Sequence, residues 1–472
     1  MMNFSINIAS TFFLLSVAFS SMNGLAQFME VEQEQDVSNC TLTMFQNDTN
    51  AYYACLTQYA LQQNWFPSPI AGLFTYLDWN GFDGFWQNGA VLETMANFCH
   101  YGNNTRYRNV LVSSWRTMEY LLKAYWPLPS YDDEGWFGLA FSRIYEVTGN
   151  ASFLQISRNV TDYLWTNGWD STLQCNGGFW FGGGHLSKNT ITSVQMLSLT
   201  ARMYRATKNE SYLAWANLTL NYLVKSALNH TTYLVSDGIA DTYDCTQRQN
   251  YNITYNAGLF IGGLAELYKI NKNDSYLVLA DKIARATIAY NSKDGVLQEY
   301  CDWDNACQHD LDGQMFKGIF VKNLRYLMDV SDNSNREFYS QWLQNNIKSV
   351  IKNSICDKRP VSQCNISYLD GPSKNPAEGP IFTENWLGPF DRATPMSQTA
   401  VLDLLIANIK DGVTCKGPGC AFNPELPPIV KLHCSDNPCP RHYACCAREK
   451  GKFTTCCQPY QTCESDGGCY PP

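Results

Sequence analysis

Two adjacent carboxylates, Asp132 and Asp133, stand in the sequence YDDEGW directly before the apolar run 136–145. Two negative charges about 5 Å apart, at an effective dielectric constant of about 20, repel by roughly 3 kcal/mol, or about two pKa units. One carboxyl group then keeps its proton while its neighbour is ionised. Retaining glycoside hydrolysis needs such a pair, held about 5 to 5.5 Å apart. The two aspartates are therefore candidates for an acid and a nucleophile acting on a sugar.

A simpler interpretation of the pair stays open. Aspartates at the start of a helix satisfy free N–H groups and compensate the helix dipole without any chemistry. Adjacent side chains diverge by about 180° in a strand and about 100° in a helix, so both face one substrate only at a loop-to-helix junction. We expect a helix from residue 133 to 148 after the proline-rich WPLPS (126–130), which places the pair at such a junction.

Amphipathic helices recur in pairs between about residues 50 and 411, joined by short turns rich in Asn, Lys and Gly. The first members are expected at 85–101, 133–148, 190–206, 256–270, 313–330 and 395–410. The second members are expected at 106–124, 152–166, 211–227, 275–290 and 336–353, with a lone helix at 51–63 as the sixth. The first members are apolar nearly all round and the second mix in polar positions, as inner and outer helices do. The pattern predicts an all-α fold, an (α/α)6 barrel of six inner and six outer helices; an open solenoid is the competing architecture.

Other candidate site residues stand at equivalent positions near the starts of the inner helices. They are Trp86, Asn88, Asn256 and Asp312, accompanied by Gln87 and Gln314. Trp136, beside the acidic pair, and Trp180, in the glycine-rich CNGGFWFGGG (175–184), are candidates for stacking on sugar rings. Each can instead be a cap, a surface residue or part of a helical core. Their convergence on one end of the ring, where we expect a cleft, favours a binding site.

Composition excludes several other functions. The net charge of −9 without a basic stripe argues against nucleic acid and anionic membranes as partners. Six scattered histidines show no metal-ligand spacing, and the glycine-rich loop lacks the strand and helix of a phosphate cradle. CDWDNAC (301–307) and Cys356 to Cys364 are typical of small disulfide loops rather than zinc sites. We therefore expect neither a metal nor a cofactor.

The two ends of the chain predict export and a second module. Residues 1–26 have the pattern of a signal peptide cut after Ala26, and eleven N-x-S/T sequons beyond residue 26 fit a glycosylated protein that is secreted, extracellular or cell-wall associated. No later run is long enough to span a membrane. A barrel domain is expected at 27–414 and a proline-rich linker at 415–433. Residues 434–472 hold eight of the nineteen cysteines, in a spacing that resembles the first half of a granulin repeat. This tail is a candidate for binding a partner or a glycan.

Five segments together resemble glycoside hydrolase family 76, the α-1,6-mannanases and their fungal cell-wall relatives. They are FWQNGAVLET (85–94), YDDEGWFGLA (131–140), CNGGFW (175–180), TYNAGLFIGGLAELY (254–268) and FKGIFVKNLRY (316–326). The resemblance implies an (α/α)6 barrel and a retaining endo-α-1,6-mannosidase, with Asp132 as nucleophile and Asp133 as general acid/base. It also implies Asp237 as a substrate contact and mannan, or another α-1,6-mannose-containing glycan, as substrate. Family members often carry Trp-Trp after the acidic pair, where this chain has Trp136-Phe137.

Two further functions stay open beside a mannosidic hydrolase or transglycosidase. The barrel can be a non-catalytic glycan-binding or adhesion scaffold, whose binding survives changes at both aspartates. It can also be another sugar enzyme of the same barrel class, such as an epimerase. Those enzymes usually depend on histidines at the site, and histidines are scarce here.

Overall fold

The computed structural model of the protein describes residues 38–65, 86–112, 114, 130–357, 364 and 379–420, except for 240, 241, 243, 247, 249, 252 and 418, and four strands between 444 and 470. The predicted signal peptide, and the predicted linker beyond residue 420, lie outside the described residues. The chain divides into two units, Met1–Cys40 and Thr41–Pro472, and the helices below belong to the second.

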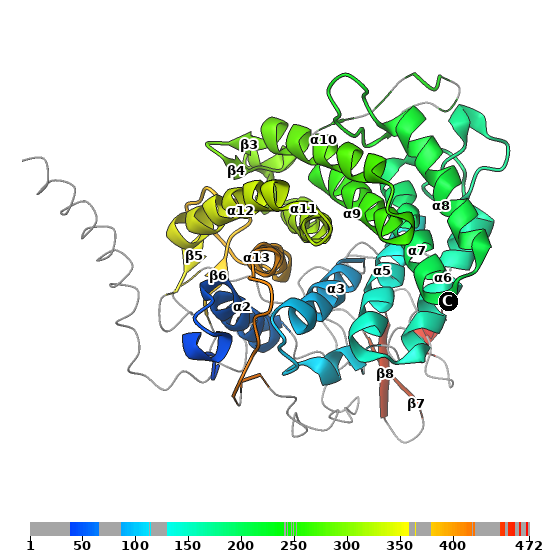
Figure 1. The fold of residues 1–472 in the computed structure, drawn as a ribbon. Helices are drawn as coiled ribbons and strands as arrows, with labels where there is room; N and C mark the ends of the chain where they lie inside the picture. Colours follow the sequence, from blue (N-terminus) through cyan, green and yellow to red (C-terminus); the bar gives the residue numbers. More distant parts are fainter. Residues whose placement is uncertain are drawn as a thin grey trace, which may run out of the picture. The chain divides into compact units, whose positions relative to one another are not determined.

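Six helices form a closed inner ring (Figure 1). They are α3 (Trp86–Tyr101), α5 (Tyr131–Thr148), α7 (Thr190–Thr207), α9 (Thr254–Asn271), α11 (Gly313–Met328) and α13 (Pro395–Ala407). Each contacts the next in chain order, and α13 contacts α3. This closure confirms the predicted barrel and excludes the open solenoid.

The outer helices lie against the inner ring (Figure 1). They are α2 (Thr49–Trp65), α6 (Ala151–Gly168), α8 (Glu210–Tyr222), α10 (Asp274–Tyr290) and α12 (Asn333–Asn353). A π-helical turn, Leu223–Ala227, continues α8. The predicted outer helix at 106–124 is helical at 108–112 and 114, and residues 113 and 115–124 lie outside the described residues. The inner helices are buried almost along their whole length, whereas α6, α8, α10 and α12 bury one face, as their compositions predict. The outer helix α2 differs from these four, because it is buried at most of its positions.

Bare glycine backbone lets neighbouring inner helices approach closely. A Cβ added at Gly258 of α9 would lie 2.6 Å from the Cα of Phe320 in α11. A Cβ added at Gly318 of α11 would lie 2.6 Å from the Cα of Ala400 in α13. Both distances are too short for any side chain, and the obstacle is backbone that cannot rotate away. The ring spacing therefore depends on glycine at these two positions.

Asparagine residues in the turns between paired helices cap the outer helices. In three of these turns the residue with left-handed backbone is Gly149, Lys208 or Lys272. The following asparagines, Asn150, Asn209 and Asn273, are the N-caps of α6, α8 and α10. Each side chain accepts a hydrogen bond from the backbone N–H two residues on. Asparagine is among the best N-cap residues, because its side-chain oxygen satisfies a free N–H of the first turn.

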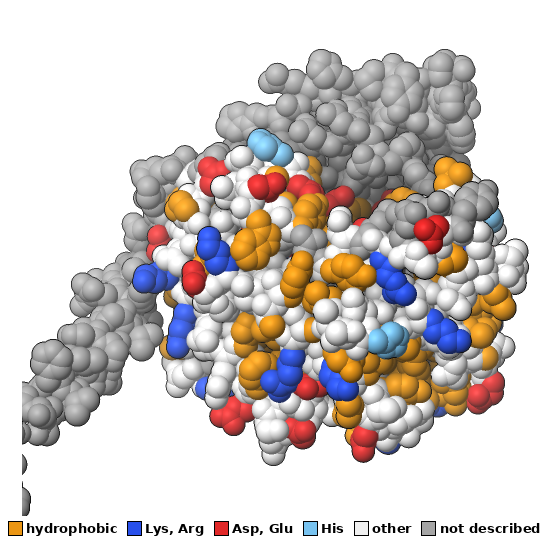
Figure 2. All heavy atoms as spheres, turned by 90° about the horizontal axis from the view of Figure 1, so that it is seen from above, with side chains coloured by type: hydrophobic (Ala, Val, Ile, Leu, Met, Phe, Trp, Pro, Cys, Tyr) orange, Lys and Arg blue, Asp and Glu red, His pale blue; other side chains and the backbone are white. Residues whose placement is uncertain are grey.

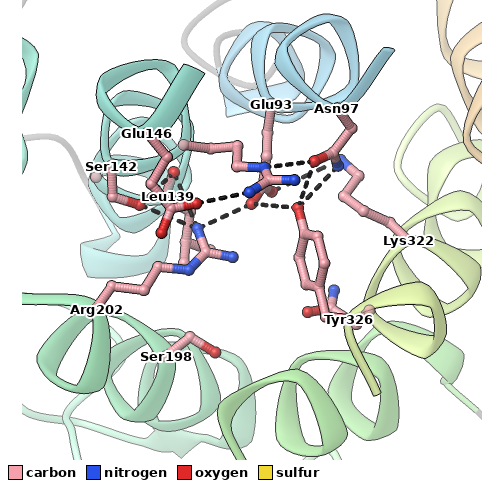
Figure 3. A network of polar contacts seen from close by, with 12 residues as sticks. Glu93, Asn97, Leu139, Ser142, Glu146, Ser198, Arg202, Lys322 and Tyr326 are labelled. Carbon is pink, nitrogen blue, oxygen red and sulfur yellow. Dashed lines mark hydrogen bonds and ion pairs between the residues drawn. The ribbon is translucent and has the colours of Figure 1, made fainter. Parts of the chain in front are cut away.

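A buried polar network joins the inner helices toward their carboxyl ends (Figure 3). Glu93 of α3 accepts hydrogen bonds from Arg202 of α7 at 3.0 Å and from Tyr326 of α11 at 3.2 Å, and Lys322 lies 3.7 Å away. Burial alone would raise the pKa of Glu93, but the positive charges of Arg202 and Lys322 outweigh burial and lower it. The carboxylate is therefore ionised and paired at the centre of the ring.

The described residues also form short strands and 3-10 turns. The strands are β1 (Lys188–Asn189), β2 (Gly238–Ile239), β3 (Ser292–Lys293), β4 (Val296–Leu297), β5 (Ile355–Cys356), β6 (Ile381–Phe382), β7 (Ala444–Arg448), β8 (Lys452–Cys457), β9 (Thr462–Cys463) and β10 (Cys469–Tyr470). The 3-10 turns are Leu42–Phe45, Gln174–Asn176, Tyr300–Asp302 and Ala306–Gln308. The last four strands form two antiparallel pairs, β7 with β8 and β9 with β10, within the predicted cysteine-rich module. The granulin resemblance of that module stays a prediction.

Disulfides close both predicted loops, Cys301–Cys307 and Cys356–Cys364. A further bond, Cys415–Cys420, lies at the start of the predicted linker. Here the Thr105 N–H donates to the carbonyl of Cys420 at 2.9 Å, which ties this segment to the barrel. Cys175–Cys245, which the sequence did not predict, spans 70 residues.

The face of the molecule in Figure 2 carries charges of both signs. On the face in Figure 2, basic and acidic side chains are interspersed among apolar and uncharged ones. In the part of the chain that the structure describes, no helix combines the length and apolar character needed to cross a membrane.

We predict that Gly258→Ala lowers the free energy of unfolding by about 1–3 kcal/mol, because the new methyl group collides with the α11 backbone. Gly184→Ala is the control, since Gly184 is exposed and its added Cβ meets only ordinary contacts at 3.6 Å or more. Urea denaturation of both variants measures the difference. Equal stability of the two variants would show that the α9–α11 spacing does not depend on glycine.

Candidate active site

The acidic pair lies in the first turn of α5, which corrects its expected setting. The helix begins at Tyr131, two residues earlier than predicted, so Asp132 and Asp133 both have helical backbone. Their side chains therefore leave the helix about 100° apart. The Tyr131 N–H donates to the carbonyl of Phe181 at 2.8 Å, which ties the start of α5 to the glycine-rich loop.

Asp132 has a strongly perturbed environment. Burial raises the pKa of Asp132 well above its usual range, and the charge of Asp133 raises it further, against a hydrogen bond to Ser130 that lowers it. Its Oδ1 is buried and accepts no hydrogen bond from the described residues. A carboxylate whose oxygen lacks a partner is costly to keep, and such perturbed groups concentrate at functional sites.

Four carboxyl groups from different segments lie close enough to the hydroxyl of Tyr255, near the start of α9, to raise its pKa. Burial raises the pKa of Tyr255 well above its usual range, and the negative charges of Asp237, Asp132, Asp312 and Glu299 raise it further. Asp132 comes from α5, Asp312 precedes α11, and Asp237 directly precedes β2. Asp132 and Asp312 therefore approach Tyr255 from the starts of inner helices, whereas Asp237 approaches it from a segment outside the ring of inner helices.

Aromatic rings from four inner helices pack together beside this acidic group. Trp86 lies 4.9 Å from Trp136 between ring centroids, and Tyr255 stacks on Phe316 at 4.0 Å and on Trp136 at 6.4 Å. Trp86, Trp136 and Phe316 are 6%, 2% and 7% exposed, so none offers a full ring face. Tyr255, which is partly exposed, is the accessible ring of this cluster.

Polar contacts tie the predicted site residues to one another. Asp312 accepts hydrogen bonds at one carboxylate oxygen from the Trp86 indole at 2.9 Å and from the Gln87 amide at 2.6 Å. Asn256 donates to Asp237 at 2.8 Å, which opposes the rise that burial causes in the pKa of Asp237. These contacts place Asp312 and Asn256 as groups that orient their neighbours.

Two other residues singled out from the sequence, Trp180 and Gln314, contact residues outside this cluster. Trp180 stacks on His185 at 5.2 Å and lies 4.5 Å from the Lys188 ammonium. Gln314 donates to the carbonyl of Cys307 and accepts from Thr394, so its amide is used within the fold. Asn88 is buried within α3.

Sequence reasoning missed two residues that shape the site. Tyr255 stands inside the quoted TYNA segment, where its neighbour Asn256 drew attention instead. Glu299 is buried and accepts hydrogen bonds from the Thr254 N–H at 3.1 Å and the Thr254 hydroxyl at 2.5 Å, which fixes the start of α9. Burial raises the pKa of Glu299 to about 8. No local pattern marks Glu299, because its partner lies 45 residues away.

A charged pocket of about 380 Å³ lies at the other end of the inner helices. Its cations are already paired: Arg143 contacts Glu146 at 2.6 Å, Lys269 contacts Glu266 at 2.9 Å, and Arg205 bridges both glutamates. This balance makes it a structural network. Within the described residues, no group of three or more His, Cys, Asp or Glu side chains is placed to hold a metal ion.

A comparison with models of protein families shows to which family this chain belongs. The model of glycosyl hydrolase family 76 matches residues 43–409. The chain belongs to this family. The match covers every described inner helix and the acidic pair.

Curated relatives of this family 76 protein include two yeast proteins. The mannan endo-1,6-alpha-mannosidase DCW1 of Saccharomyces cerevisiae is 24% identical over 68% of this chain and 77% of its own length. A putative mannan endo-1,6-alpha-mannosidase of Schizosaccharomyces pombe is 26% identical over 51% of this chain. The match spans 58% of that relative, which is less than two thirds of its length.

Solved structures show the same fold. An α-1,6-mannanase of Salegentibacter sp. HEL1_6, inactivated at two consecutive aspartates and bound to α-1,6-mannotriose, superposes with a TM-score of 0.62 at 19% identity. It covers 76% of this chain and 99% of its own. Dfg5 from Chaetomium thermophilum, in complex with glucosamine, gives a TM-score of 0.60 at 20% identity over 79% of this chain and 94% of its own.

We predict that Asp132→Asn makes the protein more stable at neutral pH. The folded pKa of Asp132 lies above its unfolded value, so its contribution to stability is fully present below pH 4 and is lost as pH rises through the folded pKa. Each unit of that rise corresponds to about 1.4 kcal/mol. Thermal unfolding should give the variant a higher Tm than the wild type at pH 7 and an equal Tm near pH 3.5.

The control is Asp294→Asn, at an exposed position on the turn between β3 and β4. The difference in Tm between this control variant and the wild type should be the same at pH 7 and near pH 3.5. A variant at Asp132 that is less stable than wild type at pH 7 would show that this carboxylate is not held under strain.

Proposed function

We propose that this protein is a retaining glycosidase that cleaves or transfers α-1,6-mannosidic linkages in mannan or another mannose-bearing glycan. The observation that carries the proposal is Asp132, whose Oδ1 is buried beside Asp133 and whose charge raises the pKa of Tyr255, in a chain of family 76. The yeast relatives named as mannan endo-1,6-alpha-mannosidases and the mannotriose complex of the bacterial mannanase support the same linkage.

In the proposed reaction Asp132 attacks the anomeric carbon while Asp133 donates a proton to the leaving glycosidic oxygen. A covalent glycosyl–enzyme forms, and Asp133 then removes a proton from the water or sugar hydroxyl that releases the product. The raised pKa of Asp132 means that the substrate-free pair holds one proton over a wide pH range. A glycosidic oxygen beside Asp133 draws this proton to Asp133, which leaves Asp132 ionised for attack.

The surrounding residues fit this chemistry. Tyr255 keeps its proton at any physiological pH because burial and the neighbouring carboxylates raise its pKa, so its hydroxyl is a donor toward the carboxylates or the sugar. Asp237, held by Asn256, is the proposed substrate contact outside α5. Trp136 stacks on the partly exposed Tyr255 ring, and Trp86 packs against Trp136.

We also propose that the protein acts outside the cell. The signal-peptide pattern of residues 1–26 and the sequons support export. Asn209 and Asn273, two of the sequon asparagines, are exposed at the starts of outer helices, where a glycan has access. The cysteine-rich tail remains a candidate for binding a partner or a glycan.

Purified protein incubated with a series of short α-1,6-mannosides should release or transfer mannose units. Asp132→Asn and Asp133→Asn should each lower kcat about 10³-fold or more, because each removes one half of the acid–nucleophile pair. Asp294→Asn should keep full activity. An inactive wild type that still binds the mannosides, with binding unchanged in both variants, would favour the non-catalytic glycan-binding alternative.

The stereochemistry of the first product tests retention and the division of roles. Proton NMR during the first minutes should show the α-anomer, since two displacements restore the configuration. A fluorinated, activated mannoside should label Asp132, and peptide mass spectrometry identifies the labelled residue. An initial β-anomer would exclude the double displacement, and a label on Asp133 would exchange the two roles.

A further inference from the structure

Gln195 of α7 reaches across to the backbone of the acidic pair. Its side chain is fully buried, and its Nε2 donates a hydrogen bond to the carbonyl oxygen of Asp132 at 3.1 Å. A carbonyl oxygen only accepts hydrogen bonds, so the nitrogen end of the amide must face it. The other end, Oε1, is buried and accepts no hydrogen bond from the described residues.

Glycine at residue 135 leaves the space that the Gln195 amide occupies. A Cβ added at Gly135 would lie 2.1 Å from Oε1 of Gln195 and 2.8 Å from its amide carbon. The missing side chain is therefore the opening through which the glutamine reaches α5. It also accounts for the glycine in the sequence YDDEGW, three residues after the first aspartate.

The buried amide of Gln195 makes the fold less stable than an apolar side chain of similar size would. A buried amide with an unsatisfied oxygen is unfavourable, and an apolar residue of similar size would remove that cost. Packing alone therefore does not explain a glutamine at residue 195, whereas its hydrogen bond to the Asp132 carbonyl does.

The first turn of α5 needs such an anchor. Ser130, at the N-cap, makes no side-chain capping bond, and like charges at Asp132 and Asp133 repel across the turn. Two bonds from outside hold it instead: the Tyr131 N–H donates to Phe181, and Gln195 donates to the Asp132 carbonyl.

We propose that Gln195 is a positioning residue, admitted by Gly135, that holds the first turn of α5 so that the Asp132 carboxylate stays aimed at the reacting carbon. The inference rests on the proposed function for the role of Asp132. A displacement of a catalytic group by about 1 Å costs about 10²-fold in rate. Gln195 therefore acts on the chemical step through the backbone, without touching the sugar.

The chain offers a matched control one turn along the same pair of helices. Gly138 of α5 faces Leu199 of α7, and a Cβ added there would lie 3.1 Å from Leu199. Gly138→Ala therefore crowds the same interface without altering the anchor on Asp132.

The test is a double-mutant cycle on α-1,6-mannosides with Gly135→Ala, Gln195→Ala and the two combined. Gln195→Ala should lower kcat about 10- to 100-fold and change KM less than about threefold. Gly135→Ala should lower kcat at least as much, because the new methyl group expels the glutamine. The double variant should match Gln195→Ala, since a shortened residue 195 leaves room for the methyl group. Gly138→Ala should lower Tm but keep kcat within about twofold.

Fold-changes in kcat that multiply in the double variant, or an equal loss of kcat in Gly138→Ala, would overturn the proposal. A second measurement does not depend on activity. It is the increase in Tm at pH 7 that Asp132→Asn causes, measured once in the wild type and once in the Gln195→Ala variant. Loss of the Gln195 hydrogen bond gives Asp132 access to water, so the increase should be smaller in the Gln195→Ala variant. If Asp132→Asn raises Tm equally in both backgrounds, the role of Gln195 is overturned, even if mannosides are not substrates. If the wild type is inactive but the Tm increase is smaller in the Gln195→Ala background, only the proposed function is refuted.

Discussion

Closure of six buried helices into one ring is the constraint on which the rest of the structure depends. A helix enclosed on all sides can carry a polar side chain only if that group is paired or serves a site. Backbone contact at Gly258 and Gly318 makes the ring tight, and Glu93 with Arg202 shows how its charges are matched. The Asp132 carboxyl group departs from this matching, because its Oδ1 is buried and accepts no hydrogen bond from the described residues.

The direction of the helices separates the two ends of the ring. Helix N-termini favour negative charge and C-termini favour positive charge. Asp132 and Asp312 stand at the starts of α5 and α11, whereas Arg202 and Arg325 lie toward the ends of α7 and α11. One end is therefore a balanced network of ion pairs, and the other gathers carboxylates around Tyr255. The acidic pair that could share a proton lies at the second end.

Much of this could be predicted from local pattern. The helices that the structure describes in full fall within about three residues of their expected bounds when the π-helical turn is counted with α8, because periodicity and turn residues act over a few positions. Asp132, Trp86, Asn256 and Asp312 can be singled out from the sequence because each stands at the start of an inner helix. The start of α5 was misplaced by two residues, since nothing local distinguishes Tyr131 from the loop before it.

The sequence by itself determined the inner helices, the barrel, the acidic pair and the family resemblance, all of which reside in short contiguous segments. Only the tertiary structure decided which side chains meet: Tyr255 near four carboxyl groups, Glu299 at the start of α9, and Gln195 beside Gly135. Gln195 and Asp132 are 63 residues apart in the chain. Their contact arises from ring closure and from one missing Cβ, a spatial coincidence that no local pattern contains.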